Sequence, residues 1–116
     1  MRVLVLAKEG EQSDAATPPT PEAMAEFQKF NEELVKAGVV VGDGRLYPSS
    51  QGKRVRFDGK KRTVIDGPFA ETKELVGGFW LWQVRSIDEA IEWLKRAPFD
   101  GGIFEIRQIF EWTEGV

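Results

Sequence analysis

The chain has 116 residues, 41% of them hydrophobic, with a formal net charge of −3. This length favours a single domain over residues 1–116, and the mild acidity argues against a protein that wraps nucleic acid as a whole. Because the sequence has no cysteine and no histidine, thiol nucleophiles, imidazole bases and zinc sites built on these residues are excluded, and we expect no metal and no cofactor.

The first predicted element is a strand over residues 3–7. All five residues are apolar, as in a strand that is buried on both faces. The run is too short for the apolar region of a signal peptide, and no other segment approaches the length of a membrane span. We therefore expect a cytoplasmic protein with no membrane contact.

A helix is expected to follow a polar loop over residues 9–20. Thr20 is a typical N-cap, Pro21 suits the first helical turn, and Gly38 is a typical stop. Between them, apolar residues recur at helical spacing along one stripe: Ala23, Phe27, Phe30, Leu34 and Ala37.

Strand patterns dominate the middle of the chain. One strand is expected from Val39 towards Tyr47, and another over residues 76–84, which is apolar on both faces. Between them, residues 53–65 predict a hairpin, because Asp58-Gly59 is a strong turn signal. A longer turn through Lys60 also fits, so the register of the hairpin stays open.

The C-terminal region predicts a helix and a strand. Ser86 and Glu89 have the spacing of a capping box, and Pro98 cannot continue the helix. Residues 103–112 alternate as in a strand, which places Glu105 and Arg107 on one face.

The order of these elements predicts an α+β fold, the ferredoxin-like βαββαβ with an inserted β-hairpin. Right-handed crossovers would place both helices on one face of the sheet. The strands over residues 3–7 and 79–84 are apolar on the opposite face as well. A second copy of the chain is the simplest cover for that face, so we expect a homodimer.

The glycine pattern at residues 42–47 does not predict a nucleotide site. It lacks the third glycine of a dinucleotide fingerprint, and no helix pattern follows it. The two glycines, Gly42 and Gly44, are more typical of a turn or a bulge.

Basic residues are concentrated on the expected hairpin. They are Lys53, Arg54, Arg56, Lys60, Lys61 and Arg62. Such a cluster can contact an anion or a nucleic acid, or it can protect an exposed strand edge. Edge protection is favoured, and a nucleic-acid partner is not expected, because Phe57 is the one aromatic residue in the cluster that could stack on a base.

A second group of charges is a candidate site. Glu71 and Lys73 follow the turn at residues 66–69, and Glu105 and Arg107 share one face of the last strand. If the turn folds over that face, these side chains converge. They could hold a polar ligand or carry acid–base chemistry, or they could be a structural ion-pair network, which their spacing alone favours.

The run V-I-D-G-P-F-A-E-T-K-E-L-V-G-G-F at residues 64–79 closely resembles the signature of the DGPF proteins in the YCII-related family. The resemblance continues at residues 37–39, 44–48, 86–93 and 105–107. It implies a ferredoxin-like fold that dimerises as an α/β barrel in a bacterial protein. A His–Asp pair is proposed as catalytic in this family. This chain has no histidine, which leaves Asp66 as the catalytic candidate.

The resemblance also favours a ligand role for the other charged positions, namely Glu71, Lys73, Glu105 and Arg107. The sequence therefore predicts a homodimer that binds a small polar or anionic molecule. Such a protein would be a cofactor-free enzyme with carboxylate acid–base chemistry or a ligand-binding accessory protein, and the sequence leaves open whether it is an enzyme. The alternative is a regulatory or interaction module without catalysis, which acts beside a sigma factor or another transcription regulator.

Overall fold

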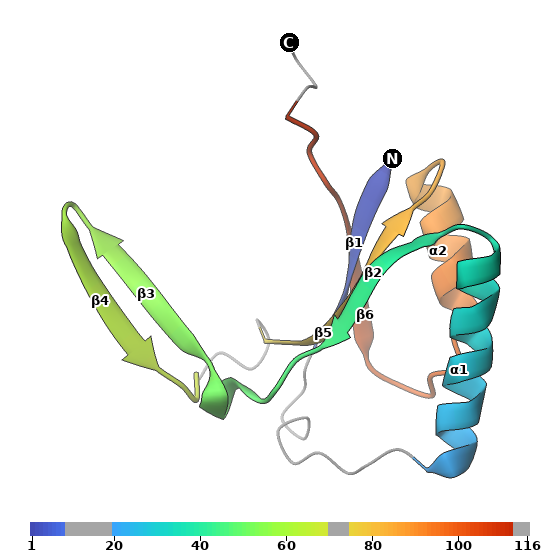
Figure 1. The fold of residues 1–116 in the computed structure, drawn as a ribbon, viewed down its shortest axis with the longest axis horizontal. Coiled ribbons are helices and arrows are strands. Elements are labelled where there is room, and N and C mark those ends of the chain that lie inside the picture. The colour runs from blue at the N-terminus through green and yellow to red at the C-terminus, as the bar shows by residue number, and fades with distance from the viewer. Residues whose placement is uncertain (9–19, 70–74, 113–116) are drawn as a thin grey trace.

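The computed structural model describes residues 1–8, 20–69 and 75–112. In these ranges the chain forms helices and strands in the order β-α-β-hairpin-β-α-β, with a short 3-10 turn before the hairpin (Figure 1). Their bounds are β1 (Arg2–Lys8), α1 (Pro21–Lys36), β2 (Val40–Arg45), η1 (Ser49–Gln51), β3 (Lys53–Asp58), β4 (Lys61–Asp66), β5 (Val76–Gln83), α2 (Ile87–Lys95) and β6 (Ile103–Gln108).

Two sheets are present in the described residues. Four strands form an antiparallel sheet in the order β2-β5-β1-β6, which is compatible with the expected ferredoxin-like fold. β3 and β4 pair only with each other. Both helices lie on one side of the four-stranded sheet, whereas the β3–β4 hairpin extends away on the other side (Figure 1). Below, the arm means residues 53–66, and the body means the four-stranded sheet with its two helices.

The core lies between the helices and one face of the sheet. Alternate residues of the two central strands point into it: Val3 and Val5 from β1, and Trp80 and Trp82 from β5. From the helices, α1 contributes Phe30 and Leu34, and α2 contributes Ala90. The two indole rings lie side by side, with 5.4 Å between their ring centroids. Aromatic area therefore dominates the contact between the sheet and its helices.

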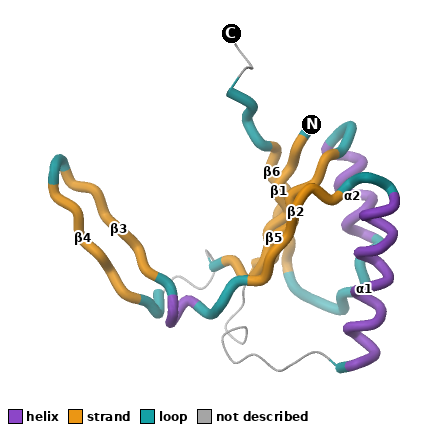
Figure 2. Tube along the Cα trace, in the orientation of Figure 1, coloured by secondary structure: helices purple, strands orange, loops and turns teal. Residues whose placement is uncertain are grey.

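The intervening residues of the central strands form the outer face, which is defined here by Leu4, Leu6, Phe79 and Leu81. These four side chains are half-buried, and no helix of the described residues covers them (Figure 2). The apolar character expected for this face is therefore present in the folded chain. The second copy that would cover it, and the dimeric barrel, stay predictions.

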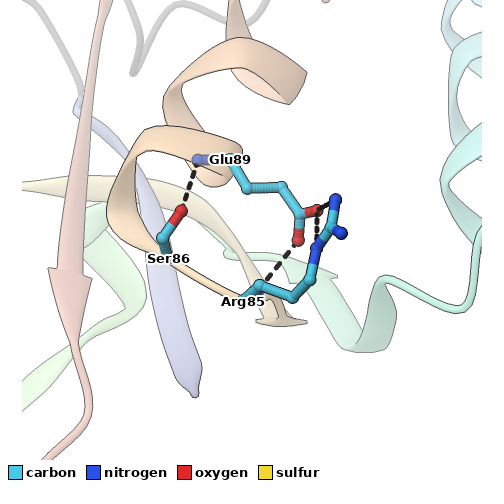
Figure 3. A network of polar contacts seen from close by, with 3 residues as sticks. All are labelled: Arg85, Ser86 and Glu89. Carbon is cyan, nitrogen blue, oxygen red and sulfur yellow. Dashed lines mark hydrogen bonds and ion pairs between the residues drawn. The ribbon is translucent and has the colours of Figure 1, made fainter.

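Side-chain caps begin both helices. Thr20 Oγ1 accepts a hydrogen bond of 3.1 Å from the backbone N–H of Ala23 at the start of α1. At α2, Ser86 Oγ accepts one of 3.1 Å from the N–H of Glu89 (Figure 3). The Glu89 carboxylate accepts from the backbone N–H of Arg85 at 2.9 Å and from its guanidinium. The capping box expected at Ser86 is thus present, with Arg85 as the residue that Glu89 reaches.

The structure gives the register of the hairpin, which the sequence leaves open: the turn consists of Gly59 and Lys60, because Asp58 pairs with Lys61 and Gly59 adopts a φ of 60°. Two strand ends differ from those expected. β2 ends at Arg45 rather than near residue 47.

The last strand is also shorter than expected, because β6 ends at Gln108 rather than at residue 112. Gln108 pairs with Val3, and the N–H of Ile109 donates to the carbonyl of Arg2 at 3.0 Å.

Within the described residues, no helix combines the length and the apolar character that crossing a membrane requires.

The helix stripe yields a stability prediction. Leu34 is fully buried, whereas its neighbour Val35 is 57% exposed. We expect Leu34→Ala to lower the free energy of unfolding by about 2–5 kcal/mol, because it leaves a cavity under α1. Val35→Ala, the control on the same helix turn, should change it by less than about 1 kcal/mol. Urea unfolding followed by circular dichroism measures both. Equal effects would contradict this description of the core.

A second prediction concerns acid stability. The backbone N–H of Arg85, followed by its guanidinium, holds the pKa of Glu89 below its ordinary value of 4.5. A carboxylate with a lowered pKa stabilises the fold above the unfolded-state pKa, and this stabilisation is lost as the pH falls through the folded-state pKa. The free energy of unfolding should therefore decrease below about pH 4.5, and less steeply in Glu89→Gln than in the wild type. Urea titrations between pH 3 and 7 measure this, and identical slopes would refute it.

Candidate functional site

A cavity lies between α1 and the helix-side face of the sheet. Its volume is about 550 Å³, which is within the range of small-molecule sites. Its walls come from the first turns of α1, the ends of β1, β2 and β6, the middle of β5, and the segment before β6. The lining residues are Val5, Ala7, Ala23, Met24, Phe27, Asp43, Gly44, Arg45, Gly77, Gly78, Phe79, Trp80, Pro98, Phe99 and Phe104.

Four aromatic rings form one continuous wall of this cavity. Phe27 of α1 stacks on Trp80 of β5, with 5.8 Å between ring centroids and 14° between ring planes. Phe99 stacks on Phe104 with a centroid distance of 4.7 Å, and it also contacts Trp80 at 6.3 Å. A wall of this kind offers flat apolar surfaces to a ligand that has a planar ring.

Space in the cavity depends partly on glycine. Gly78 of β5 pairs with Arg45 of β2, and a Cβ atom at Gly78 would lie 3.1 Å from the carbonyl oxygen of Gly44. A side chain at Gly78 would therefore make an unusually tight contact with the neighbouring backbone. Gly78 lies on the same face of β5 as Trp80, so the missing side chain leaves volume in the cavity there.

Asp43 and Arg45 are the charged residues of the cavity lining. They are two apart on β2, and therefore point to the same side of the sheet, towards α1. Both are exposed, and neither forms a hydrogen bond or an ion pair with another described residue. The site thus combines an aromatic wall with one carboxylate and one guanidinium that are available to a ligand. Elsewhere in the described ranges, no three acidic side chains gather closely enough to hold a metal ion.

Asp66, the predicted catalytic residue, lies at the end of β4 and not in this cavity. Its carboxylate pairs with Lys53 Nζ at 2.5 Å across the base of the arm, and the side chain is 73% exposed. Among the described residues, no hydrogen bond or ion pair joins Asp66 to Glu105 or Arg107. Its catalytic role stays a prediction, and the geometry favours a structural role in the arm.

The predicted ligand-binding residues are only partly within the described chain. Glu105 and Arg107 lie on the outer-face side of β6, opposite Leu6 and Leu4 of β1. They form an ion pair of 3.7 Å with each other, and both are well exposed. Glu71 and Lys73 lie outside the described residues, so the expected convergence of the four side chains stays a prediction.

Sequence reasoning missed Asp43 and Arg45 as site residues. Their segment does not match a nucleotide fingerprint, and its glycines and its part in the family resemblance indicate no role for these two side chains. A usable signal was present, because two charges at i and i+2 on a strand share one face. That signal could not show that the shared face is the one beneath α1.

The motif at residues 66–69 closes the base of the arm. The N–H of Gly67 donates to the carbonyl of Gly52 at 2.9 Å, and the N–H of Gly52 donates to that of Ser49 at the same distance. A Cβ atom at Gly67 would lie only 1.8 Å from the carbonyl oxygen of Ser49. The Arg54 guanidinium covers the ring of Phe69, 3.9 Å from its centroid. Only glycine therefore fits at position 67, where the arm leaves the body.

Replacing this glycine should loosen the arm. In Gly67→Ala, the methyl group would displace Ser49, and we expect a loss of about 1–3 kcal/mol of local stability. The amide protons of Gly52 and Gly67 should then exchange faster, as measured by hydrogen exchange with NMR detection. Gly101→Ala is the control, because no atom lies within 4 Å of a Cβ there. Unchanged protection in Gly67→Ala would refute this account of the arm base.

Comparisons with known proteins agree with the signature in the sequence. The family model described as YCII-related domain matches residues 1–113. An uncharacterized protein of Rhizobium meliloti (strain 1021), R00369, is 33% identical over 95 residues. That alignment covers 79% of this chain and 77% of the relative.

Proposed function

The chain belongs to the YCII-related family, and within that family we propose that it binds a planar aromatic acid in the cavity between α1 and the sheet. The observation that carries the proposal is the pairing of an aromatic wall with two charged side chains, Asp43 and Arg45, that have no partner among the described residues. Sites for small molecules typically combine an apolar lining with a few convergent polar groups of this kind.

Each part of the site favours one part of the ligand. The ring of the ligand would lie against Trp80 and Phe99, where offset stacking is favourable. Its carboxylate would receive two hydrogen bonds from the planar guanidinium of Arg45. Asp43 would accept a hydrogen bond from a hydroxyl or amino substituent on the ring, since a carboxylate is an acceptor when it is ionised.

The same two side chains would also suit a proton-transfer reaction. Asp43 would accept the proton of a hydroxyl substituent on the ring, which leaves the negative charge on that oxygen and the proton on the Asp43 carboxylate, and Arg45 would hold the ligand in place through its carboxylate. This chemistry uses the chain's own carboxylate and guanidinium, and it is the form of catalysis that we propose if the protein turns over its ligand.

The proposal includes a homodimer. The outer face (Leu4, Leu6, Phe79 and Leu81) is apolar and has no covering helix in the described residues. Full burial of a large apolar side chain contributes about 1.5–3 kcal/mol, so four half-buried side chains would give a second copy a substantial gain. Most of the cavity lining lies on the side of the sheet that faces the helices, with Phe79 as the residue that it shares with the outer face, so we expect the cavity to stay accessible in such a dimer.

Ligand binding is tested with hydroxynaphthoic acid as the probe. We expect 6-hydroxy-2-naphthoate to bind the wild type, and Arg45→Gln to raise its dissociation constant by about ten-fold or more, because a charged hydrogen bond is lost. For 2-naphthol, which has no carboxylate, the same variant should have little effect. Asp43→Asn should weaken both probes less than Arg45→Gln weakens the acid. Isothermal titration calorimetry measures each constant.

The matched control is Arg107→Gln, which removes an exposed arginine from the other side of the sheet. It should leave binding of the naphthoate unchanged. Loss of binding in Arg107→Gln but not in Arg45→Gln would overturn the cavity proposal in favour of the site predicted at the last strand. Absence of naphthoate binding by the folded wild type would reject the proposed ligand class.

A further inference from the structure

The arm has two chemically different faces. Val55 pairs directly with Val64, and the next cross-strand pair is Arg56 with Thr63. Successive residues of a strand point to opposite faces, so these two pairs lie on opposite sides of the ribbon. One side carries the apolar arm face, formed by Val55, Phe57 and Val64, with the charged residues Lys53, Arg62 and Asp66 beside it. The other side carries Arg54, Arg56 and Lys61, together with Asp58 and Ile65.

The apolar arm face is exposed in the isolated chain. Val55, Phe57 and Val64 are 52%, 70% and 62% exposed. The guanidinium of Arg62 lies 4.4 Å from the centroid of the Phe57 ring and fixes the ring in place. In the described residues the ribbon has no neighbouring strand, and a lone two-stranded ribbon is only marginally stable in water. A contiguous apolar face on such a ribbon is typical of an interaction surface.

The distribution of charge along the sequence indicates which kind of partner the arm contacts. Residues 53–66 hold six of the chain's 16 basic residues and two of its 19 acidic ones, which leaves ten basic and seventeen acidic residues elsewhere. The arm is therefore positive, and the rest of the chain taken as a whole is negative. Another copy of this chain, outside its own arm, is as a whole electrostatically complementary to the arm.

The position of the arm agrees with that partner. The arm extends from the body on the side away from α1 and α2, which is also the side of the uncovered outer face (Figure 2). A second copy seated on the outer face would therefore lie within reach of the arm. In a two-fold dimer the contact is reciprocal, so each copy gives one arm and receives one.

We infer that the arm is a clasp, whose apolar face of Val55, Phe57 and Val64 packs on the body of a second copy of this chain. The inference rests on the homodimer proposed above, and it adds a contact beyond the outer face. Duplex DNA fits the observations less well. It would use the basic side of the ribbon and would leave the apolar arm face in water.

The test compares two neighbouring cross-strand pairs of the same ribbon. Val55→Ser/Val64→Ser changes the apolar arm face, and Arg56→Lys/Thr63→Ser changes the opposite side while it keeps the charge. Sedimentation equilibrium measures the dimer dissociation constant of each variant, and far-ultraviolet circular dichroism checks that each one folds. We expect the first variant to raise the constant at least about ten-fold and the second to leave it within about three-fold of the wild type.

Phe57→Ser is a second, single change on the apolar arm face, and it should also weaken the dimer. It keeps the inference testable if the double variant does not fold. A wild type that is monomeric at micromolar concentration would overturn both the homodimer and the clasp. A stable wild-type dimer that neither apolar-face variant weakens would overturn the clasp alone and leave the outer-face dimer standing.

The remaining possible outcome of the test is that the arm binds nucleic acid. Fluorescence anisotropy with a labelled DNA duplex of mixed sequence, measured between 50 and 200 mM salt, shows whether the arm binds DNA. Salt-dependent binding that Arg56→Ser/Lys61→Ser abolishes, together with a dimer constant unaffected by the valine changes, would assign the arm to nucleic acid and overturn the inference. Absence of such binding is expected.

Discussion

The fold depends on the packing of two helices against one face of the central strands β1 and β5. Trp80 and Trp82 are the largest side chains in that contact, and both are almost fully buried. Because strand residues alternate, the same two strands must present their remaining side chains on the outer face. The alternation of side chains along these two strands therefore has two results: one face is buried by the helices, and the other face is apolar and uncovered. The cavity lies beyond Trp80, where the packing of the helices on the sheet ends. The aromatic wall of the cavity continues from there into the segment before β6.

Local patterns in the sequence predicted the elements well, because caps, turns and apolar periodicity act over a few residues. Thr20 and Ser86 begin their helices as expected. The end of β6 could not be predicted in this way, since it depends on pairing with β1, which is distant in sequence. The position of the hairpin turn at Gly59 and Lys60 could not be predicted for a related reason, because the register of a hairpin is set by both strands together.

The candidate site was harder to predict than the fold. Asp66 stood out because it belongs to a distinctive motif, but its carboxylate pairs with Lys53 at the arm base. Backbone crowding explains why the motif has glycine at position 67. Asp43 and Arg45 belong to no motif with a known chemistry. They line the cavity together with α1 and with residues near position 99, which are distant in sequence and adjacent only in the folded chain.

The strand order has a consequence for how the chain is made. β1 is a central strand, but its neighbours are β5 and β6, the last two strands of the described residues. Val3 pairs with Trp82 and with Gln108, so during synthesis on the ribosome the first strand has no partner until β5 has emerged. A nascent chain therefore carries an unpaired apolar strand for most of its synthesis, while its helices and the arm can form from local contacts. Pairing between such distant segments is slow, and the exposed strand makes this interval the time of greatest risk of aggregation.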